Sequence, residues 1–351
     1  MVTLRPFIGL VPTGDVRART VGGARRSAAR LARRSTHPRH VAWLEGTLED
    51  DPVDVDEWIA EGSLLVDDEP RLRLVEQTLL DGRRVLGVLG LVTLSDLVPH
   101  EGTDEAAVRR RIERDRRQQV DSRPLLAVLP ADPPGLSDLT STARARAPEV
   151  DVEDADGVRH RVWQLTGDEA TRIEALLAPY PCLLADGHHR VAAAAAMGRH
   201  EVPALVAFAS NPPLLDDVWR LAAVPRHARD AVHRWVTSLD DVAGPVEVRY
   251  GDVVRRVAAH PDELPVEASM RIAEDVPSVA RVTSTGDTTA MAIAMRDGAV
   301  VVGSRAPTVT EVLAAVAGGR ALPPKSTAFR PKPRVGLVLH RIELARQEPE
   351  G

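Results

Sequence analysis

Three side chains that can carry positive charge stand where one helix of this chain is predicted to begin. Residues 181–198 read PCLLADGHHRVAAAAAMG, so His188, His189 and Arg190 follow Asp186-Gly187 and precede a run of alanines. Cations are unfavourable at a helix N-terminus, because the N–H groups there already carry partial positive charge. A bound phosphate would accept hydrogen bonds from the free N–H groups, the imidazoles and the guanidinium together. The spacing therefore predicts a phosphate site at 187–190, with Asp186 as the N-cap residue.

The same residues also have a purely structural interpretation. Asp186 and Arg190 are four positions apart, so they could form an ion pair on one helix face while the histidines lie in an exposed turn. A metal site fits less well, because adjacent histidines on a helix point in different directions and no Cys, Asp or Glu stands nearby at ligand spacing. If the site is catalytic, Asp186 is one candidate to accept a proton from a substrate hydroxyl.

A second candidate group is the segment PHEGT at 99–103, which lies between a predicted strand and a predicted helix. Glu101 could act there as a general base or a magnesium ligand, with His100 orienting it. The alternative is a simple helix entrance with Thr103 as the N-cap.

A third group lies in GGRALPPKST at 318–327, which comes close to a Walker A motif. Pro324 stands where the second glycine belongs, and proline has no N–H to offer a phosphate, so a P-loop is excluded. Lys325 is one of only two lysines in the chain. Its ammonium, followed by the hydroxyls of Ser326 and Thr327, could bind a phosphate or a substrate carboxylate, or the segment could be a surface loop. Lys332 lies between two prolines and is expected to serve the placement of its segment rather than to bind a ligand.

The segment at 187–193, which contains the predicted phosphate site, resembles a known motif. Residues 187–193 read Gly-x-His-Arg-x-x-Ala, which looks like the phosphate-binding box of the ParB/sulfiredoxin superfamily. Members of that superfamily hold nucleotide phosphates at a helix N-terminus. Sulfiredoxins have a catalytic cysteine where this chain has His188, so the resemblance does not imply their reductase chemistry.

Most of the chain resembles a narrower group, the domain of unknown function 1015 family. The motifs that carry this resemblance are LRPFIGL at 4–10, HEGT at 100–103, LLADGHHRVAAA at 183–194 and LPPKSTAFRPKPRVGLVL at 322–339. Some ParB/sulfiredoxin-like relatives are free-serine kinases, which implies nucleotide-dependent phosphorylation of serine as an activity to test. The family's extended Pro-Tyr-Asp-like motif has no counterpart in RARTVGGARRSAAR at 17–30, which puts retention of that activity in question.

The elements that must position these groups follow from the apolar pattern. Asp81-Gly82 between two apolar runs predicts a hairpin, and a strand, a turn and a helix from 182 followed by a strand at 202–209 predict a βαβ unit. Helices are predicted at 54–62, 104–120, 167–180 and 308–318, the last with a Thr308/Glu311 capping box. Further strands are predicted at 124–130, 158–165, 246–251, 279–285, 289–296 and 298–304, and 131–157 reads as a loop or subdomain boundary. The fold class is α/β, or α+β, with mixed sheets and a ParB/sulfiredoxin-like strand-turn-helix core.

Composition limits the function classes. The 351 residues are 44% apolar and carry a net charge of −6, which fits a globular protein with no general attraction to nucleic acid. The basic run at 17–39 and the acidic run at 45–69 offset each other and read as solvated helix faces rather than a DNA-binding arm. Cys182 is the only cysteine, which excludes an intrachain disulfide and Cys-based metal sites. No apolar run reaches about 18 residues and no signal peptide is recognised, so a cytoplasmic protein is expected.

The regions expected are an N-terminal α/β part at 1–130, a ParB/sulfiredoxin-like core at 131–215 and a C-terminal α+β part at 216–351, or one integrated domain. The predicted function is a nucleotide-dependent phosphotransferase for a small hydroxyl metabolite. It would use ATP or ADP with Mg²⁺, and have no membrane or nucleic-acid partner. The alternative is a catalytically inactive nucleotide- or metabolite-binding regulator. The predicted catalytic residues are Glu101, Asp186 and Lys325, and the predicted binding residues are Gly187, His188, His189, Arg190, Ser326 and Thr327.

Overall fold

The computed structural model describes residues 2–13, 39, 41–45, 52–154, 156–286 and 288–342. Most of the basic run at 17–39 and all of 17–30 therefore lie outside the described residues. The chain forms two compact units: unit 1 is Met1–Pro99, Thr103–Pro213 and Pro331–Gly351, and unit 2 is His100–Gly102 and Leu214–Arg330. None of the helices described is long and apolar enough to cross a membrane.

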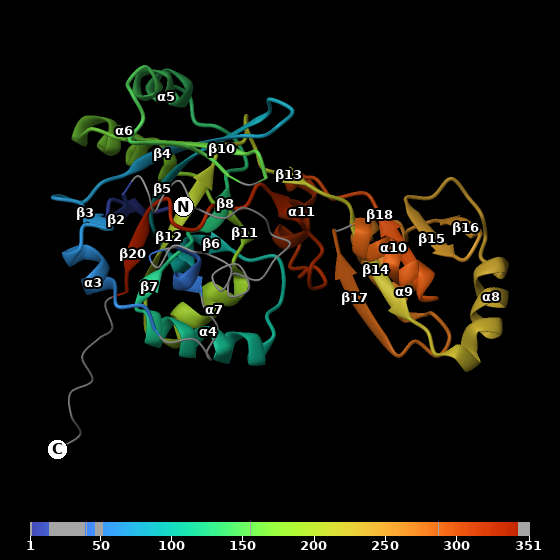
Figure 1. The fold of residues 1–351 in the computed structure, drawn as a ribbon. Coiled ribbons are helices and arrows are strands. Elements are labelled where there is room, and N and C mark those ends of the chain that lie inside the picture. Colours follow the sequence, from blue (N-terminus) through green and yellow to red (C-terminus); the bar gives the residue numbers. More distant parts are fainter. Residues whose placement is uncertain are drawn as a thin grey trace. The chain divides into compact units, whose positions relative to one another are not determined.

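Unit 1 is built on a nine-stranded mixed sheet (Figure 1). Its strand order is β6 (Leu97–Val98), β11 (Cys182–Asp186), β8 (Leu125–Val128), β12 (Glu201–Ala207), β5 (Arg84–Thr93), β4 (Arg73–Thr78), β10 (Arg159–Gln164) and β9 (Val150–Glu153), with β1 (Leu4–Arg5) paired to β5. The β6–β11 and β8–β12 pairs are parallel and the other pairs are antiparallel. This confirms the mixed α/β fold class.

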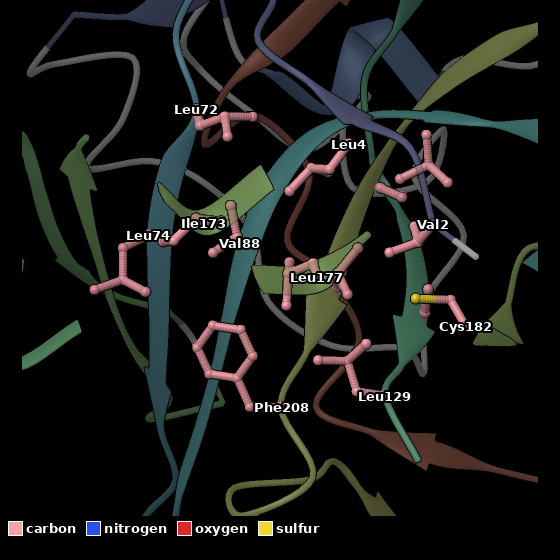
Figure 2. Packing of buried hydrophobic residues seen from close by; sticks show 14 of the residues in the cluster. Val2, Leu4, Leu72, Leu74, Val88, Leu129, Ile173, Leu177, Cys182 and Phe208 are labelled. Atoms are coloured by element: carbon pink, nitrogen blue, oxygen red, sulfur yellow. The ribbon is translucent and has the colours of Figure 1, made fainter. Parts of the chain in front are cut away.

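One face of this sheet carries the main hydrophobic core. Helices α5 (Leu136–Arg144) and α6 (Gly167–Leu177) contribute Leu139, Ile173 and Leu177 to a cluster with strand residues such as Leu74 and Val88. Figure 2 shows Ile173 and Leu177 of α6 among the strand side chains, with Cys182 at one side of the cluster. Burial of this apolar area holds the sheet rigid beneath the loops at its edge.

A second, four-stranded sheet of unit 1 has the order β3 (Leu64–Val66), β2 (Gly9–Pro12), β20 (Leu339–Arg341) and β7 (Val120–Asp121). Helix α3 (Val55–Ala60) and the 3₁₀ helix η1 (Val41–Glu45) contribute Trp58, Val41 and Leu44 to its core. Helices α4 (Glu105–Gln118) and α7 (His188–Ala196) pack against each other, and a short 3₁₀ helix, η2 (Leu94–Asp96), precedes β6.

Unit 2 has an antiparallel five-stranded sheet with the order β16 (Val253–Val257), β15 (Val246–Tyr250), β18 (Val300–Ser304), β14 (Val218–Ala223) and β17 (Arg281–Thr285). Strands β13 (Leu214–Leu215) and β19 (Phe329–Arg330) pair separately. Its helices are η3 (Arg226–Ala228), α8 (Arg229–Ser238), α9 (Pro265–Glu274), α10 (Thr288–Arg296) and α11 (Val309–Ala317).

Several local predictions are confirmed. Strands β4 and β5 form the hairpin around Asp81-Gly82, and Thr308 is the N-cap residue of α11, with the predicted capping box to Glu311. Helix α4 is also present, but its N-cap is Asp104, whose carboxylate accepts from the Ala107 N–H, so the prediction of Thr103 is wrong.

Two element predictions are wrong. Residues 131–157 contain α5 and β9, because Leu136, Leu139, Thr140 and Ala143 form a buried helical face. Residues 288–296 form α10 instead of a strand, since Ala and Met favour helix and their alternation fits either structure over so short a window.

The βαβ prediction is wrong as well. β8 lies between β11 and β12, antiparallel to the first and parallel to the second. The strands on either side of α7 are therefore antiparallel and not neighbours. A strand from earlier in the chain separates them, and no local pattern indicates such an insertion.

Candidate functional site

The turn between β11 and α7 depends on a glycine. Gly187 is the N-cap residue of α7 with φ of +114°, a conformation that L-residues rarely adopt, and it has no side chain with which to cap the helix. The prediction of Asp186 as the N-cap is therefore wrong. The Arg190 N–H donates to the Gly187 carbonyl at 2.8 Å, and the partial positive charge of the helix lies at this point.

Asp186 instead lies between two cations. Its Oδ2 accepts from Arg190 Nη2 at 2.7 Å, and its Oδ1 accepts from Lys332 Nζ. Arg190 Nη1 also donates to the main-chain carbonyls of Arg123 and Pro124, both at 2.8 Å. The ion pair that the structural interpretation anticipated is thus present, and Lys332 completes a triad that we call the Asp186 triad: Asp186, Arg190 and Lys332.

The charges of the triad determine what Asp186 can do. Burial by itself would raise the pKa of this carboxyl, but Arg190, Lys332 and Arg123 together lower its pKa below the ordinary value. Asp186 is therefore ionised and is a weak proton acceptor at neutral pH. Two cations share this one carboxylate, so the triad itself carries net positive charge.

The two histidines of the box have different surroundings. His189 Nε2 accepts a hydrogen bond from the Asp104 N–H at 3.0 Å. His188 is buried at the start of α7. The His189 ring therefore supports the entrance to α4 through this bond.

Lys332 is held by a buried polar network. Gln77 Nε2 donates to the Lys332 carbonyl at 3.2 Å and lies 3.4 Å from His160 Nδ1, and His160 Nε2 lies 2.8 Å from Asp154 Oδ2. Gln77 and His160 are almost fully buried and directly opposite each other on β4 and β10. The network fixes the main chain of the segment that brings Lys332 to Asp186.

A small, mostly apolar pocket adjoins this network. Its lining is Val75, Gln77, Leu89, Pro124, Leu205, Pro333, Arg334, Leu337 and Val338. The pocket lies on the face of β4 opposite to core residue Leu74, because side chains alternate along a strand. Two segments contribute to both the pocket and the Asp186 triad. Pro333, which lines the pocket, follows Lys332 directly, and Pro124, which also lines it, accepts a hydrogen bond from Arg190 through its carbonyl.

Lys332 is the residue that the sequence interpretation underrated. It pairs with a carboxylate 146 positions away. The composition of the chain could have indicated its importance. Lysine occurs only twice, whereas arginine is abundant, and both lysines fall in the motif at 322–339.

The other predicted site residues form a separate cluster in unit 2. The Glu101 carboxylate accepts from the Lys325 N–H at 2.9 Å, the Thr327 N–H at 3.1 Å and the Thr327 hydroxyl at 3.2 Å. His100 Nε2 lies 2.8 Å from Thr327 Oγ1 and 3.6 Å from Glu101 Oε1. These hydrogen bonds to Glu101 thus connect the segment at 100–103 to the turn at 323–327.

Arg220 on β14 supports the same turn and was not anticipated from the sequence. The side chain is fully buried, and Nη1 donates to the Pro324 carbonyl at 2.9 Å and to Ser284 Oγ at 2.5 Å. Nη2 donates to Ser326 Oγ at 3.2 Å, and that hydroxyl donates to the Pro323 carbonyl at 2.7 Å. Burial lowers the pKa of Arg220 to about 10, while the charge of Glu101 opposes the shift. Ser326 is also fully buried, so it supports the turn rather than facing a ligand.

A divalent cation does not fit Glu101, the carboxylate predicted as a possible magnesium ligand, or the neighbouring candidate Asp186. No group of three or more potential ligand residues occurs in the part of the chain that the structure describes. Asp186 is bound by a guanidinium and an ammonium, and Glu101 by N–H and O–H donors, all of which compete with a metal. No chemical step is therefore assigned to Mg²⁺ at either residue.

The fold and the site define a mixed α/β protein with a cationic, glycine-initiated helix N-terminus at the edge of its main sheet. The chain belongs to the family described as "Protein of unknown function (DUF1015)", whose model matches residues 15–210. No curated protein matches the chain.

Solved structures resemble the chain only distantly. A free serine kinase in complex with AMP has 16% identity and a TM-score of 0.40, covering 71% of this chain and 92% of the kinase. SbnI from Staphylococcus aureus, truncated at its C-terminus, has 12% identity and a TM-score of 0.42, covering 72% of this chain and 81% of its own. A conserved hypothetical protein from Pyrococcus furiosus has 16% identity and a TM-score of 0.41, covering 71% and 93%.

Proposed function

We propose that unit 1 binds a nucleoside di- or triphosphate with its phosphates at the start of α7, and that the protein transfers a phosphoryl group to a small hydroxyl metabolite. The Asp186 triad carries the proposal, because two cations share one carboxylate beside the glycine-initiated N-terminus of α7. Such a place is favourable for an anion with several oxygens.

Within the triad, Lys332 is the cation suited to contact the ligand. Its side chain is 39% exposed, whereas that of Arg190 is 14% exposed and already bonded to Asp186 and two carbonyls. An ammonium has three donors, and Asp186 takes one of them. Arg190 then positions Asp186 and the 123–124 segment, while Lys332 binds phosphate oxygens at the positively charged end of α7.

The transfer step needs a proton acceptor for the substrate hydroxyl. Asp186 is the residue of unit 1 proposed for this role. Glu101 and Lys325 lie in unit 2 and are proposed as a separate site, with Glu101 as a proton acceptor and Lys325 as the cation that stabilises negative charge there. Free serine is the acceptor to assay first, as the substrate that the name of the free serine kinase prints.

A second candidate function, nucleotide binding without transfer, is favoured by one specific observation. Both proposed proton acceptors already accept hydrogen bonds from cations or from main-chain and hydroxyl donors, which lowers their basicity. A chain with this arrangement could bind a nucleotide as a regulator and leave it unchanged.

Calorimetric titration of the full chain with ADP and ATP tests the binding proposal. Lys332→Ala should weaken nucleotide affinity by about 10- to 100-fold, the usual effect of losing one charge-assisted hydrogen bond. The matched control is Arg83→Ala, which removes an exposed cation paired with Asp81 and should leave affinity unchanged. Equal affinity of wild type and Lys332→Ala would exclude phosphate binding at the Asp186 triad.

Formation of phosphoserine from ATP or ADP and serine, followed by phosphorus NMR, separates the two functions. Product formation that is lost in Lys332→Ala supports transfer. Tight nucleotide binding with no product from serine or other small hydroxyl compounds supports the regulator.

A further inference from the structure

The main chain at Lys332 is held by three polar side chains of unit 1 that lie in a row. Gln77 Nε2 donates to the Lys332 carbonyl and lies 3.4 Å from His160 Nδ1, and His160 Nε2 lies 2.8 Å from Asp154 Oδ2. Gln77 and His160 are each 1% exposed, so bulk water does not reach them to replace a lost partner. Each bond in the row therefore depends on the direction of the next one.

The two ends of the row determine which form of the imidazole fits between them. The Lys332 carbonyl can only accept, so Gln77 turns its NH₂ group toward it, and the same group lies next to His160 Nδ1. Burial raises the pKa of Asp154, but the hydrogen bond from His160 and the charge of Arg334 outweigh burial and lower that pKa below 3.8. Asp154 therefore accepts at neutral pH. A ring with its proton on Nε2 and none on Nδ1 satisfies both neighbours.

An imidazolium does not fit the same place. With a proton on each nitrogen, the Nδ1–H group of His160 would face the NH₂ group of Gln77, and two donors form no hydrogen bond. Reversal of the Gln77 amide would turn Oε1 toward the ring, and it would break no bond at Oε1, which has no partner among the described residues. The reversed amide would, however, set an oxygen against the Lys332 carbonyl. Relief of either conflict takes the donor away from Lys332.

The charged groups that face His160 act in opposite senses. Asp154 attracts positive charge on the ring, whereas Arg334, whose Nη1 lies 3.7 Å from Asp154 Oδ2, repels it. Gln77 on β4 and Val152 on β9 lie directly opposite His160, and both are uncharged. Asp154 and Arg334 are thus the charges that oppose each other at the ring.

The neighbours of His160 on its own strand do not face it. Side chains alternate along a strand, so Arg159 and Arg161 lie on the other face of β10. Arg159 pairs there with Asp151, and Arg161 pairs with Glu76.

We propose that His160 is a positioning residue for Lys332: it holds the Lys332 main chain through Gln77 while Nδ1 is unprotonated, and it releases that main chain when acid protonates Nδ1. Release loosens the segment at 331–338 and with it the ammonium that pairs with Asp186. The consequence for phosphate binding rests on the function proposed above, whereas the link between His160 and the main chain of Lys332 does not.

Hydrogen exchange of the full chain without ligand tests the link itself. After correction for the pH dependence of exchange in an unfolded chain, the amides of 334–338 should exchange faster at about pH 5 than at about pH 8. His160→Asn offers Gln77 an oxygen that acid does not protonate, so its corrected rates should be equal at both pH values. The matched control is His200→Asn, which removes an exposed histidine of unit 1 and should behave as the wild type.

A second variant guards against an effect of His160→Asn on folding. Gln77→Met keeps the length of the side chain and removes its bonds to the Lys332 carbonyl and to His160, so it should exchange fast at both pH values. Corrected rates in the wild type that do not change with pH would overturn the inference. So would a rise in acid that is as large in Gln77→Met as in the wild type.

Calorimetric titration with ADP measures the consequence for binding. Toward acid, the wild-type affinity should fall by about 3- to 10-fold more than that of His160→Asn, the usual effect of one lost hydrogen bond. Comparison of the two proteins at each pH removes the contribution of ADP's own titration. An equal fall in both proteins overturns the inference and leaves the nucleotide site intact. If the wild type binds no ADP at any pH, the proposed function fails, and hydrogen exchange alone decides the inference.

Discussion

The conformation and packing of Gly187 allow a quantitative test of the α7 entrance. A Cβ added at Gly187 would lie 2.4 Å from Leu125 Cδ2, 2.9 Å from Arg190 Nη2 and 3.0 Å from Arg190 Nε, at φ of +114°. The positive φ costs an L-residue about 1–2 kcal/mol, and overpacking against a buried leucine costs about 1–3 kcal/mol. Gly187→Ala should therefore lower the free energy of unfolding by about 2–5 kcal/mol. It should also weaken nucleotide binding, because the guanidinium of Arg190 must move.

Two other glycines separate the contributions. Gly198 has φ of +74° with open space around its Cβ position, and Gly167 has open space without a positive φ. Gly198→Ala should cost only the strain, about 1–2 kcal/mol, and Gly167→Ala should be neutral or stabilising by up to about 1 kcal/mol. Urea denaturation followed by circular dichroism measures all three variants. A Gly187→Ala loss no larger than that of Gly198→Ala would refute the close packing of Leu125 and Arg190 over this turn.

Three further predictions concern single side chains. The pKa of Asp186 is lower in the folded state than its ordinary value of 3.8 in the unfolded chain. Its contribution to stability is therefore complete above pH 3.8 and is lost as the pH falls through the pKa of the folded state. Asp186→Asn should remove this contribution and flatten the acid side of a curve of stability against pH. Cys182 is buried and burial raises its pKa to about 12, so a thiol reagent should label it only under unfolding conditions, and rapid labelling of native protein would contradict its position in the core. Thr308→Ala breaks the capping box with Glu311 at the start of α11 and should cost about 1 kcal/mol in urea denaturation, whereas an unchanged midpoint would show that the cap is energetically silent.

Local sequence information predicted much of the secondary structure around the site. The Asp81-Gly82 hairpin, the strand at Cys182–Asp186, helix α7 and the Thr308/Glu311 cap were all predicted from patterns spanning a few residues. The pairing of Asp186 with Arg190 belongs to the same class, because helix geometry brings together side chains four positions apart.

The sequence by itself therefore determined the helix start, its glycine turn and the charged side chains that surround them. Tertiary structure decided which distant groups meet them: Lys332 reaches Asp186 across 146 positions, and Glu101 reaches the Lys325 N–H across 224. It also placed β8 between β11 and β12, which removed the βαβ unit that the local pattern predicted. Short-range patterns follow from backbone geometry, whereas these pairings depend on the order in which strands and loops pack, and that order is a property of the whole chain.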